Sequence, residues 1–253
     1  MIKTLLCRSG VILAAGLFVL QTAAAEPAMI AKARAYLGGD TVLSNVSSIH
    51  YQGKLFLAAA DPAKAPEEVG VDIIFQKPDR QRSVLTAEKR IEITALDGYE
   101  AWQKVEDPKD PTRWTMNLLG PDQIKSLRAN AWENLSFFRG LEGRRGTIED
   151  LGTVTADGVA CRKLAFVHSP EVAFYRYFDE ATGRLVLTET AQGESIREEG
   201  LIMAGGVKFP QTLVTTMRQP DGSALKITIR FEKITVNETF ADSLFAVPSF
   251  GFR

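Results

Sequence analysis

Cysteine and histidine are both scarce in this sequence. The two cysteines are Cys7 and Cys161, and the two histidines, His50 and His168, lie far apart. Cys7 precedes an apolar N-terminal run. Cys161, left alone once that segment is removed, cannot form an internal disulfide, and we expect it to pack as a small apolar side chain. A zinc site needs three or four His, Cys or carboxylate ligands. We therefore predict no metal site, with His50 solvated and His168 in a turn.

The sequence also lacks an excess of charge and the common catalytic motifs. Lys and Arg number 30 against 31 Asp and Glu, which argues against a nucleic-acid-binding protein. Neither a G-x-S-x-G elbow nor a phosphate-binding loop occurs. The acidic pairs Glu67-Glu68 and Glu198-Glu199 are adjacent, and neighbouring residues on a strand face opposite ways. We predict that the protein is not an enzyme. Distant polar residues that converge in a lipid-processing enzyme remain the alternative.

Long hydrophobic runs are missing except at the start of the chain. Lys3 and Arg8 precede an apolar run over residues 9–20, and an A-x-A pattern ends at Ala25. This order predicts a secretory signal peptide over residues 1–25, followed by one domain over residues 26–253. An uncleaved anchor is the alternative, although a membrane helix needs about 20 apolar residues. Loss of Lys3 and Arg8 moves the formal charge from −1 to −3.

The spacing of apolar residues predicts a mostly β fold with two helical segments. Residues 26–37 have helical spacing, a short helical turn is expected through Val42 and Leu43, and a helix is expected from Pro121 to about Arg139. Most other segments alternate with a period of two and are joined by short turns, as expected for antiparallel hairpins. About ten such strands cannot stay flat. The prediction is an α+β fold: a curled antiparallel sheet forming an open, unclosed β-barrel, with helices as a lid.

The apolar side of this curled sheet predicts a hollow interior. Residues on one face of the strands, together with the stripe of the 121–139 helix, would line it and bind acyl chains; each could also be ordinary core. The expected lining consists of Val71, Ile73, Phe75, Leu85, Ile91, Ile93, Trp102, Ile124, Leu127, Leu135, Phe138, Leu225, Ile227, Ile229 and Phe231.

Five short motifs follow one another in an order that resembles a known family. They are LSNVSSIHYQG at 43–53, FQKPD at 75–79, DGYEAW at 97–102, FDEATGR at 178–184 and FAVP at 245–248. This order is similar to that of the LolA-type periplasmic lipoprotein carriers and outer-membrane lipoprotein-sorting proteins. The resemblance implies an apolar cavity in an unclosed barrel, and carriage of lipoprotein or lipid acyl chains toward the outer membrane. It implies no cofactor, no chemical turnover and a periplasmic location, with inner- and outer-membrane transfer proteins as partners of what we expect to be a monomer.

One position departs from the family pattern. The carriers have an arginine just before the proline of the second motif, and this chain has Lys77, which keeps the charge but not the planar fork. Lys77 and Arg80 are therefore our candidates for transfer or head-group contact; a solvated rim is the alternative for this basic cluster. A lipid- or lipoprotein-sensing regulatory module on the same fold is the alternative function.

Overall fold

The structure is a computed structural model that describes residues 26–57, 67–219 and 221–248. The expected signal peptide at residues 1–25 lies outside the described residues. So does most of the loop that was expected between the first two strands.

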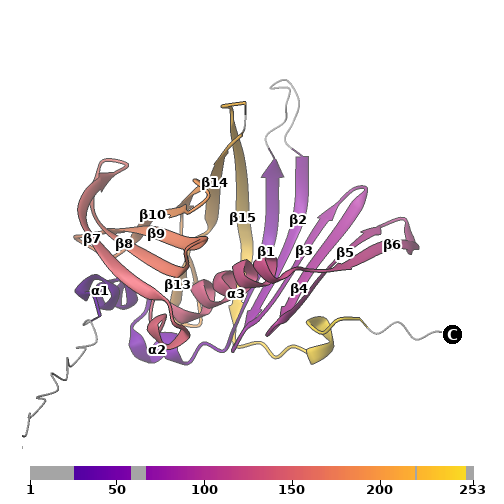
Figure 1. Cartoon of the computed structure of the whole chain (residues 1–253), viewed down its shortest axis with the longest axis horizontal. Coiled ribbons are helices and arrows are strands. Elements are labelled where there is room, and N and C mark those ends of the chain that lie inside the picture. The colour runs from indigo at the N-terminus through magenta and orange to yellow at the C-terminus, as the bar shows by residue number, and fades with distance from the viewer. Residues whose placement is uncertain (1–25, 58–66, 220, 249–253) are drawn as a thin grey trace, which may run out of the picture.

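One curled antiparallel sheet of 13 strands dominates the fold (Figure 1). Its spatial order is β6-β5-β4-β3-β2-β1-β15-β14-β11-β10-β9-β8-β7, and the two ends of this series do not pair with each other. The predicted unclosed, curled antiparallel sheet is confirmed. The strands are Ser48–Leu57 (β1), Glu67–Gln76 (β2), Arg80–Ala87 (β3), Arg90–Asp97 (β4), Glu100–Asp107 (β5), Asp110–Leu118 (β6), Thr147–Ala156 (β7), Val159–Ser169 (β8), Val172–Asp179 (β9), Leu185–Thr190 (β10), Ser195–Glu199 (β11), Thr212–Arg218 (β14) and Ala224–Val236 (β15).

The strand count exceeds the expected number of about ten for two reasons. Pro111 does not prevent residues 110–118 from forming β6, an edge strand, and Pro108 lies in the turn before it. An edge tolerates proline because one side of the strand needs no ladder hydrogen bond. The segment 195–218 forms four short strands, of which Ile202–Ala204 (β12) and Val207–Phe209 (β13) pair with each other as a separate hairpin.

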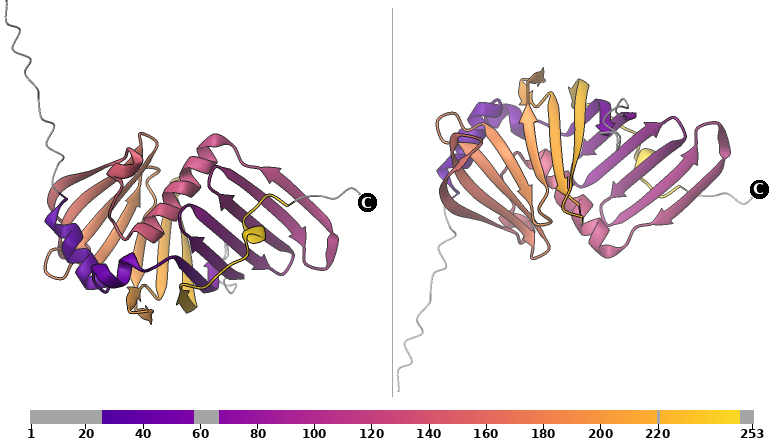
Figure 2. Two further views of the ribbon diagram at one scale, coloured as in Figure 1. Left: turned by 90° about the horizontal axis from the view of Figure 1, so that it is seen from below. Right: turned by 90° about the horizontal axis from the view of Figure 1, so that it is seen from above.

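Three α-helices lie against this sheet: Ala28–Leu37 (α1), Asp40–Ser44 (α2) and Pro121–Ser136 (α3). Pro121 occupies the first turn of α3, and the side-chain oxygen of Gln123 accepts a hydrogen bond from the Gly120 N–H at 3.0 Å. Seen from below, α3 crosses between the two wings of the sheet (Figure 2). Two single 3-10 turns, Glu142–Arg144 (η1) and Asp242–Leu244 (η2), complete the elements.

The helix α3 ends three residues before the expected Arg139. Its last residue is Ser136, and Phe137 and Phe138 follow with φ of 48° and 72°. These left-handed conformations are strained for bulky L-residues. The two rings leave the helix direction at this point and pack into the interior instead.

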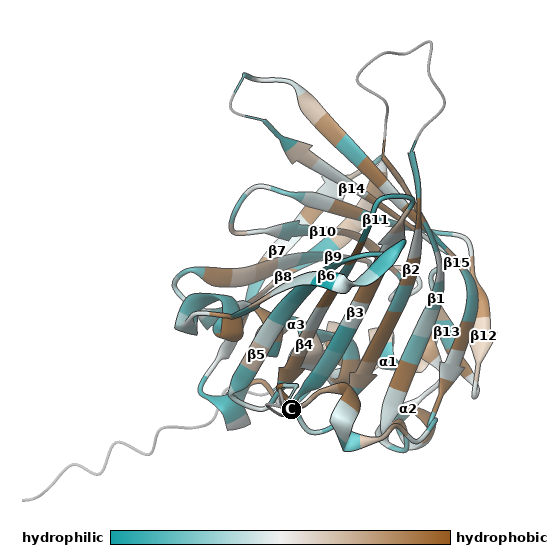
Figure 3. Cartoon of the chain, turned by 90° about the vertical axis from the view of Figure 1, so that its right-hand side faces the viewer, coloured by the Kyte–Doolittle hydropathy of each residue, from teal (hydrophilic) through white to brown (hydrophobic). Residues whose placement is uncertain are grey.

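Cross-strand register defines the two faces of the sheet, because directly paired residues point to the same side. Ile49 pairs with Phe75, Phe75 with Gln81, and Gln81 with Leu96. Ile49, Phe75 and Leu96 are buried together with Leu135 of α3, so this is the inner face. Polar and apolar residues alternate along several strands (Figure 3).

Three residues of the expected lining lie on the other face. Trp102 pairs with Ala95, one position away from the inner-face pair Leu96–Ala101, and the same parity places Ile91 and Ile93 outside. The indole N–H of Trp102 donates to the backbone oxygen of Phe245 at 2.9 Å. The C-terminal segment thus covers part of the outer face, so that β4 and β5 carry apolar residues on both sides. For Trp102, Ile91 and Ile93, the expected cavity role is corrected.

His50 also lies beneath this C-terminal segment instead of being solvated. Its ring nitrogens lie 2.9 Å from Asp72 and 2.8 Å from Glu238, and its ring contacts Phe240 edge-on. The pKa of Glu238 is lowered, chiefly by its hydrogen bond with His50. Cys161 is fully buried, as expected.

Candidate functional site

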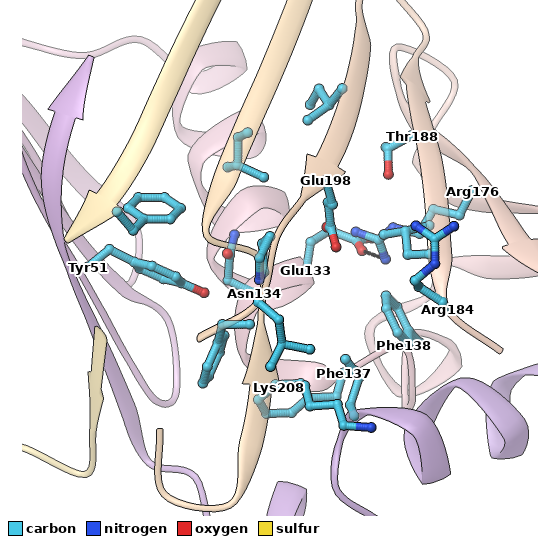
Figure 4. A pocket seen from close by; sticks show the side chains of 18 of the residues that line it. Tyr51, Glu133, Asn134, Phe137, Phe138, Arg176, Arg184, Thr188, Glu198 and Lys208 are labelled. Atoms are coloured by element: carbon cyan, nitrogen blue, oxygen red, sulfur yellow. Dashed lines mark ion pairs between the residues drawn. The ribbon is translucent and has the colours of Figure 1, made fainter. Parts of the chain in front are cut away.

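A cavity of about 520 Å³ lies on the inner side of the sheet, where α1, α3, β13 and the central strands meet. It separates two hydrophobic clusters. One is centred on β1, β2 and β15, and the other on β8, β9 and α1. The close-up shows Tyr51 on one side of this space, Arg176 and Arg184 on the opposite side, and Glu198 between them (Figure 4).

The wall on the β1 side is apolar and aromatic. The Tyr51 ring contacts the rings of Phe75, Phe209 and Phe231, with centroids 6.0, 5.8 and 4.8 Å away. Burial raises the pKa of the Tyr51 phenol well above its usual value. Leu213 also borders the cavity on this side. This wall offers a surface for hydrocarbon.

The opposite wall contains a buried ion pair. Arg176 of β9 pairs with Glu133 of α3, and the Nε2 of His168 lies 2.6 Å from the same carboxylate. The guanidinium of Arg176 also lies 4.9 Å from the ring centroids of both Phe138 and Phe166. His168 lies near the end of β8, whereas we expected it in a turn. This pair connects α3 to the β7–β10 wing of the sheet.

Three further ionisable side chains line the cavity: Arg184, Glu198 and Lys208. Burial raises the pKa of Glu198 to about 7, although the charges of Arg176 and Arg184 act in the opposite direction. Lys208 places its Nζ 4.3 Å from the centroid of the Tyr36 ring. The cavity is therefore amphipathic, whereas the sequence led us to expect an apolar one.

The C-terminal end of α3 is fixed at the cavity by α1. The buried side chain of Arg34 donates from Nη1 to the backbone oxygens of Ser136 and Phe137, at 3.1 and 2.8 Å. The Ser136 hydroxyl accepts a hydrogen bond from the Phe138 N–H at 3.2 Å. These contacts hold the strained backbone of Phe137 and Phe138, both of which line the cavity.

The middle of α3 is attached to the turn between β2 and β3, to β3 and, through Asp79, to η1. The largely buried carboxylate of Asp79 binds Arg128 of α3 at 2.9 Å and Arg144 of η1 at 3.0 Å. Asn130 of α3 donates to the side chain of Gln81 at 3.1 Å. Polar contacts therefore fix α3 to both wings of the sheet, and the helix cannot leave the cavity without breaking them.

The structure brings five of the predicted lining residues to the cavity. They are Ile73, Phe75, Phe138, Ile229 and Phe231. Seven others share the inner face or the α3 stripe without bordering this cavity, and the buried ones among them are packed as core: Val71, Leu85, Ile124, Leu127, Leu135, Leu225 and Ile227.

Neither of the two predicted head-group residues borders the cavity. Arg80 binds Asp97 at 2.8 Å and Asp242 at 2.6 Å, so it anchors the C-terminal segment. Lys77 is largely exposed, and its pKa is lowered by partial burial and by the charge of Arg34. Neither side chain has a place in the site that we describe here.

The polar wall was missed at the level of sequence, although part of its signal was present. Arg176 shares its face of β9 with Phe174 and Phe178, so it occupies an inward position in an otherwise aromatic series. Glu198 shares its face of β11 with Ile196. A charge at an apolar position of an alternating strand indicates either a buried pair or a site, and both occur here.

The curled, unclosed sheet with a helix across its concave side and a cavity beneath defines a LolA-like half-barrel. A LolA superfamily protein from Nitrosomonas europaea has this fold, with a TM-score of 0.55, 12% identity, and coverage of 86% of this chain and 96% of that one. An outer membrane lipoprotein-sorting domain from Vibrio parahaemolyticus has a TM-score of 0.54 and 10% identity, with coverage of 86% of this chain and 94% of that one. A DUF1329 family protein from Desulfovibrio piger has a TM-score of 0.54 and 7% identity, with coverage of 87% of this chain and 96% of that one.

Comparisons of sequence give no further relatives: no family model and no curated protein matches this chain. Within the described residues, no group of three or more His, Cys, Asp or Glu side chains is placed to hold a metal ion. Within the same residues, no helix has the length and apolar character needed to cross a membrane.

Proposed function

We propose that this protein is a periplasmic carrier that binds an acyl chain of a lipid or lipoprotein in its cavity and ferries it toward the outer membrane. The observation that carries the proposal is the cavity itself, with its aromatic wall, inside a LolA-like half-barrel. The Vibrio neighbour is named for outer membrane lipoprotein sorting, which supports the same role.

The energetics suit reversible carriage. Burial of a hydrocarbon chain contributes about 0.8 kcal/mol per methylene, so about ten buried methylenes give roughly 8 kcal/mol before ordering costs. This is enough for capture without a specific polar contact. Because the aromatic wall cannot change its chemistry, release requires movement of α3, the element that lies across the cavity.

Native mass spectrometry of the protein purified from the periplasm tests the proposal. We expect a co-purified lipid or lipoprotein on the wild type. Leu213 borders the cavity, so Leu213→Trp should fill it and strongly reduce the bound fraction. Thr216 lies on the outer face of the same strand, and Thr216→Trp is the matched control that should keep the lipid. Equal retention by both variants, or no bound lipid on any form, would contradict the proposal.

A further inference from the structure

The charges in the cavity are not balanced in pairs. Arg176 and Glu133 form an ion pair, and His168 adds a second contact to the same carboxylate. Arg184 and Lys208 are different, because neither forms an ion pair within the part of the chain that the structure describes. Arg184 acts on the carboxyl groups of Asp179 and Glu198 only through its charge, without an ion pair at contact distance. Two cations without a directly bound carboxylate thus line a cavity whose other wall is aromatic.

The backbone fixes the position from which Arg184 enters the cavity. The Asp179 N–H donates to the backbone oxygen of Arg184 at 2.8 Å, and the Arg184 N–H donates to the Thr182 hydroxyl at 3.2 Å. The preceding Gly183 has φ of 80°, and a Cβ there would lie 2.7 Å from the backbone of Lys32. This tight approach of α1 to the hairpin holds the Arg184 backbone, and its partly buried side chain lines the cavity (Figure 4).

Lys208 reaches the same space from a different element. It lies in β13, opposite Met203 of β12, and this hairpin is separate from the main sheet. Its ammonium group contacts the face of Tyr36 from α1. The cavity lining therefore includes the planar guanidinium of Arg184 and the ammonium group of Lys208 on its flexible stem. Both kinds bind carboxylate and phosphate.

We propose that the cavity binds a single-chain amphiphile whose anionic head group, a carboxylate or a phosphate, lies against Arg184 and Lys208. The hydrocarbon would lie along Tyr51 and Phe231. This inference rests on the proposed function and narrows it to one class of ligand. A volume of about 520 Å³ is in the range of pockets that hold one small ligand, about 300–1,000 Å³, and so suits one chain better than several.

Glu198 is compatible with such a head group. Its pKa is raised to about 7, so a large share of this side chain is neutral at neutral pH. A neutral carboxyl group can donate a hydrogen bond to an anionic oxygen, whereas an ionised one would repel it. The charges that act on it are those of Arg176 and Arg184, and Tyr51, Glu133 and Lys208 line the same cavity.

Displacement of the uncharged dye N-phenyl-1-naphthylamine tests the inference. Laurate, dodecyl phosphate and 1-dodecanol share one chain length and differ in the head group. We expect both anions to displace the dye at concentrations about tenfold lower than dodecanol. Inorganic phosphate, which has no chain, should not displace it. The comparison of laurate with dodecyl phosphate shows which anion the site prefers.

Two variants and a matched control locate the head group. Arg184→Gln and Lys208→Gln should each weaken laurate or dodecyl phosphate about tenfold and leave dodecanol unchanged. Arg197 lies on the outer face of β11 in an ion pair with Asp157, and Arg197→Gln should change neither. Circular dichroism verifies that each variant folds. The comparison of the three chain compounds on the wild type tests the inference even if a variant does not fold.

Each failure has a distinct meaning. If dodecanol and the anions displace the dye equally, the head-group inference is wrong while acyl-chain binding stands. If inorganic phosphate displaces the dye as well as dodecyl phosphate does, the ligand is not an amphiphile and the inference is wrong. If the dye does not bind and no chain compound binds in calorimetry, the proposed function fails together with the inference.

Discussion

At the scale of single residues, the cavity is defined by the few ionisable side chains that interrupt an apolar interior. Glu133 and Arg176 neutralise each other across the gap between α3 and β9. Glu198 has no such dedicated partner among the described residues, and burial is the dominant influence on its pKa. A carboxyl group in this position costs stability whenever it is ionised.

The pH dependence of stability should reveal this cost. The pKa of Glu198 rises from 4.5 to about 7 on folding. The folded state then holds the proton more tightly, so the wild type should lose stability between about pH 4.5 and pH 7. Relative to Glu198→Gln, we expect a loss of about 1–3 kcal/mol across this window. Urea unfolding of both proteins at pH 4.5 and 7.5 measures the difference, and parallel pH profiles would contradict the assignment.

The residue scale also shows where sequence patterns are sufficient. Phe75, Ile229 and Phe231 were expected to line the hollow and they border the cavity, because clean alternation along a strand determines which residues share a face. Trp102 was placed on the wrong face. Alternation says which residues belong together, but not which side is inner when a distant segment covers the other side. Only the tertiary contact with Phe245 decides that.

At the scale of elements, α3 determines access to the cavity. Its C-cap residue Phe137 has a left-handed backbone, and Arg34 from α1 donates to the carbonyl groups at this end of the helix. The helix itself could be predicted from its apolar stripe and from Pro121. Its polar attachments could not be predicted. Arg34 and Asp79 reach α3, and Glu133 of α3 reaches Arg176, only in the folded protein. The same holds for β6, in which Pro111 is tolerated because the strand is an edge.

Removal of the Arg34 guanidinium should therefore weaken this end of the lid. Arg34→Met keeps much of the apolar stem and leaves the carbonyl groups of Ser136 and Phe137 without this donor. We expect a loss of about 2–4 kcal/mol in the free energy of unfolding, measured with urea. Arg162→Met is the control, because the Arg162–Asp150 pair lies at the surface and should contribute little to stability. Equal effects of the two substitutions would show that Arg34 does not hold α3.

At the scale of the whole molecule, the sheet remains open and α3 connects its two wings. The order of strands leaves β6 and β7 as free edges, while Asp79 and Arg176 bind α3 from opposite sides. This architecture could be predicted, since about ten twisted antiparallel strands must curl and an amphipathic helix needs a concave apolar surface. The division of the interior into an aromatic wall and a charged wall could not. That division depends on which strands face each other across the hollow.

The account depends on a hydrocarbon chain that occupies the space between these walls. The most direct measurement is a crystal structure of the protein with 16-bromohexadecanoate, in which anomalous scattering locates the bromine at the chain terminus. The account predicts a bromine peak inside the hollow beneath α3, near Tyr51 and Phe231, with the carboxylate toward Arg184. A bound ligand with its bromine on the outer face near Trp102, or an interior in which side chains leave no room for the chain, would contradict it.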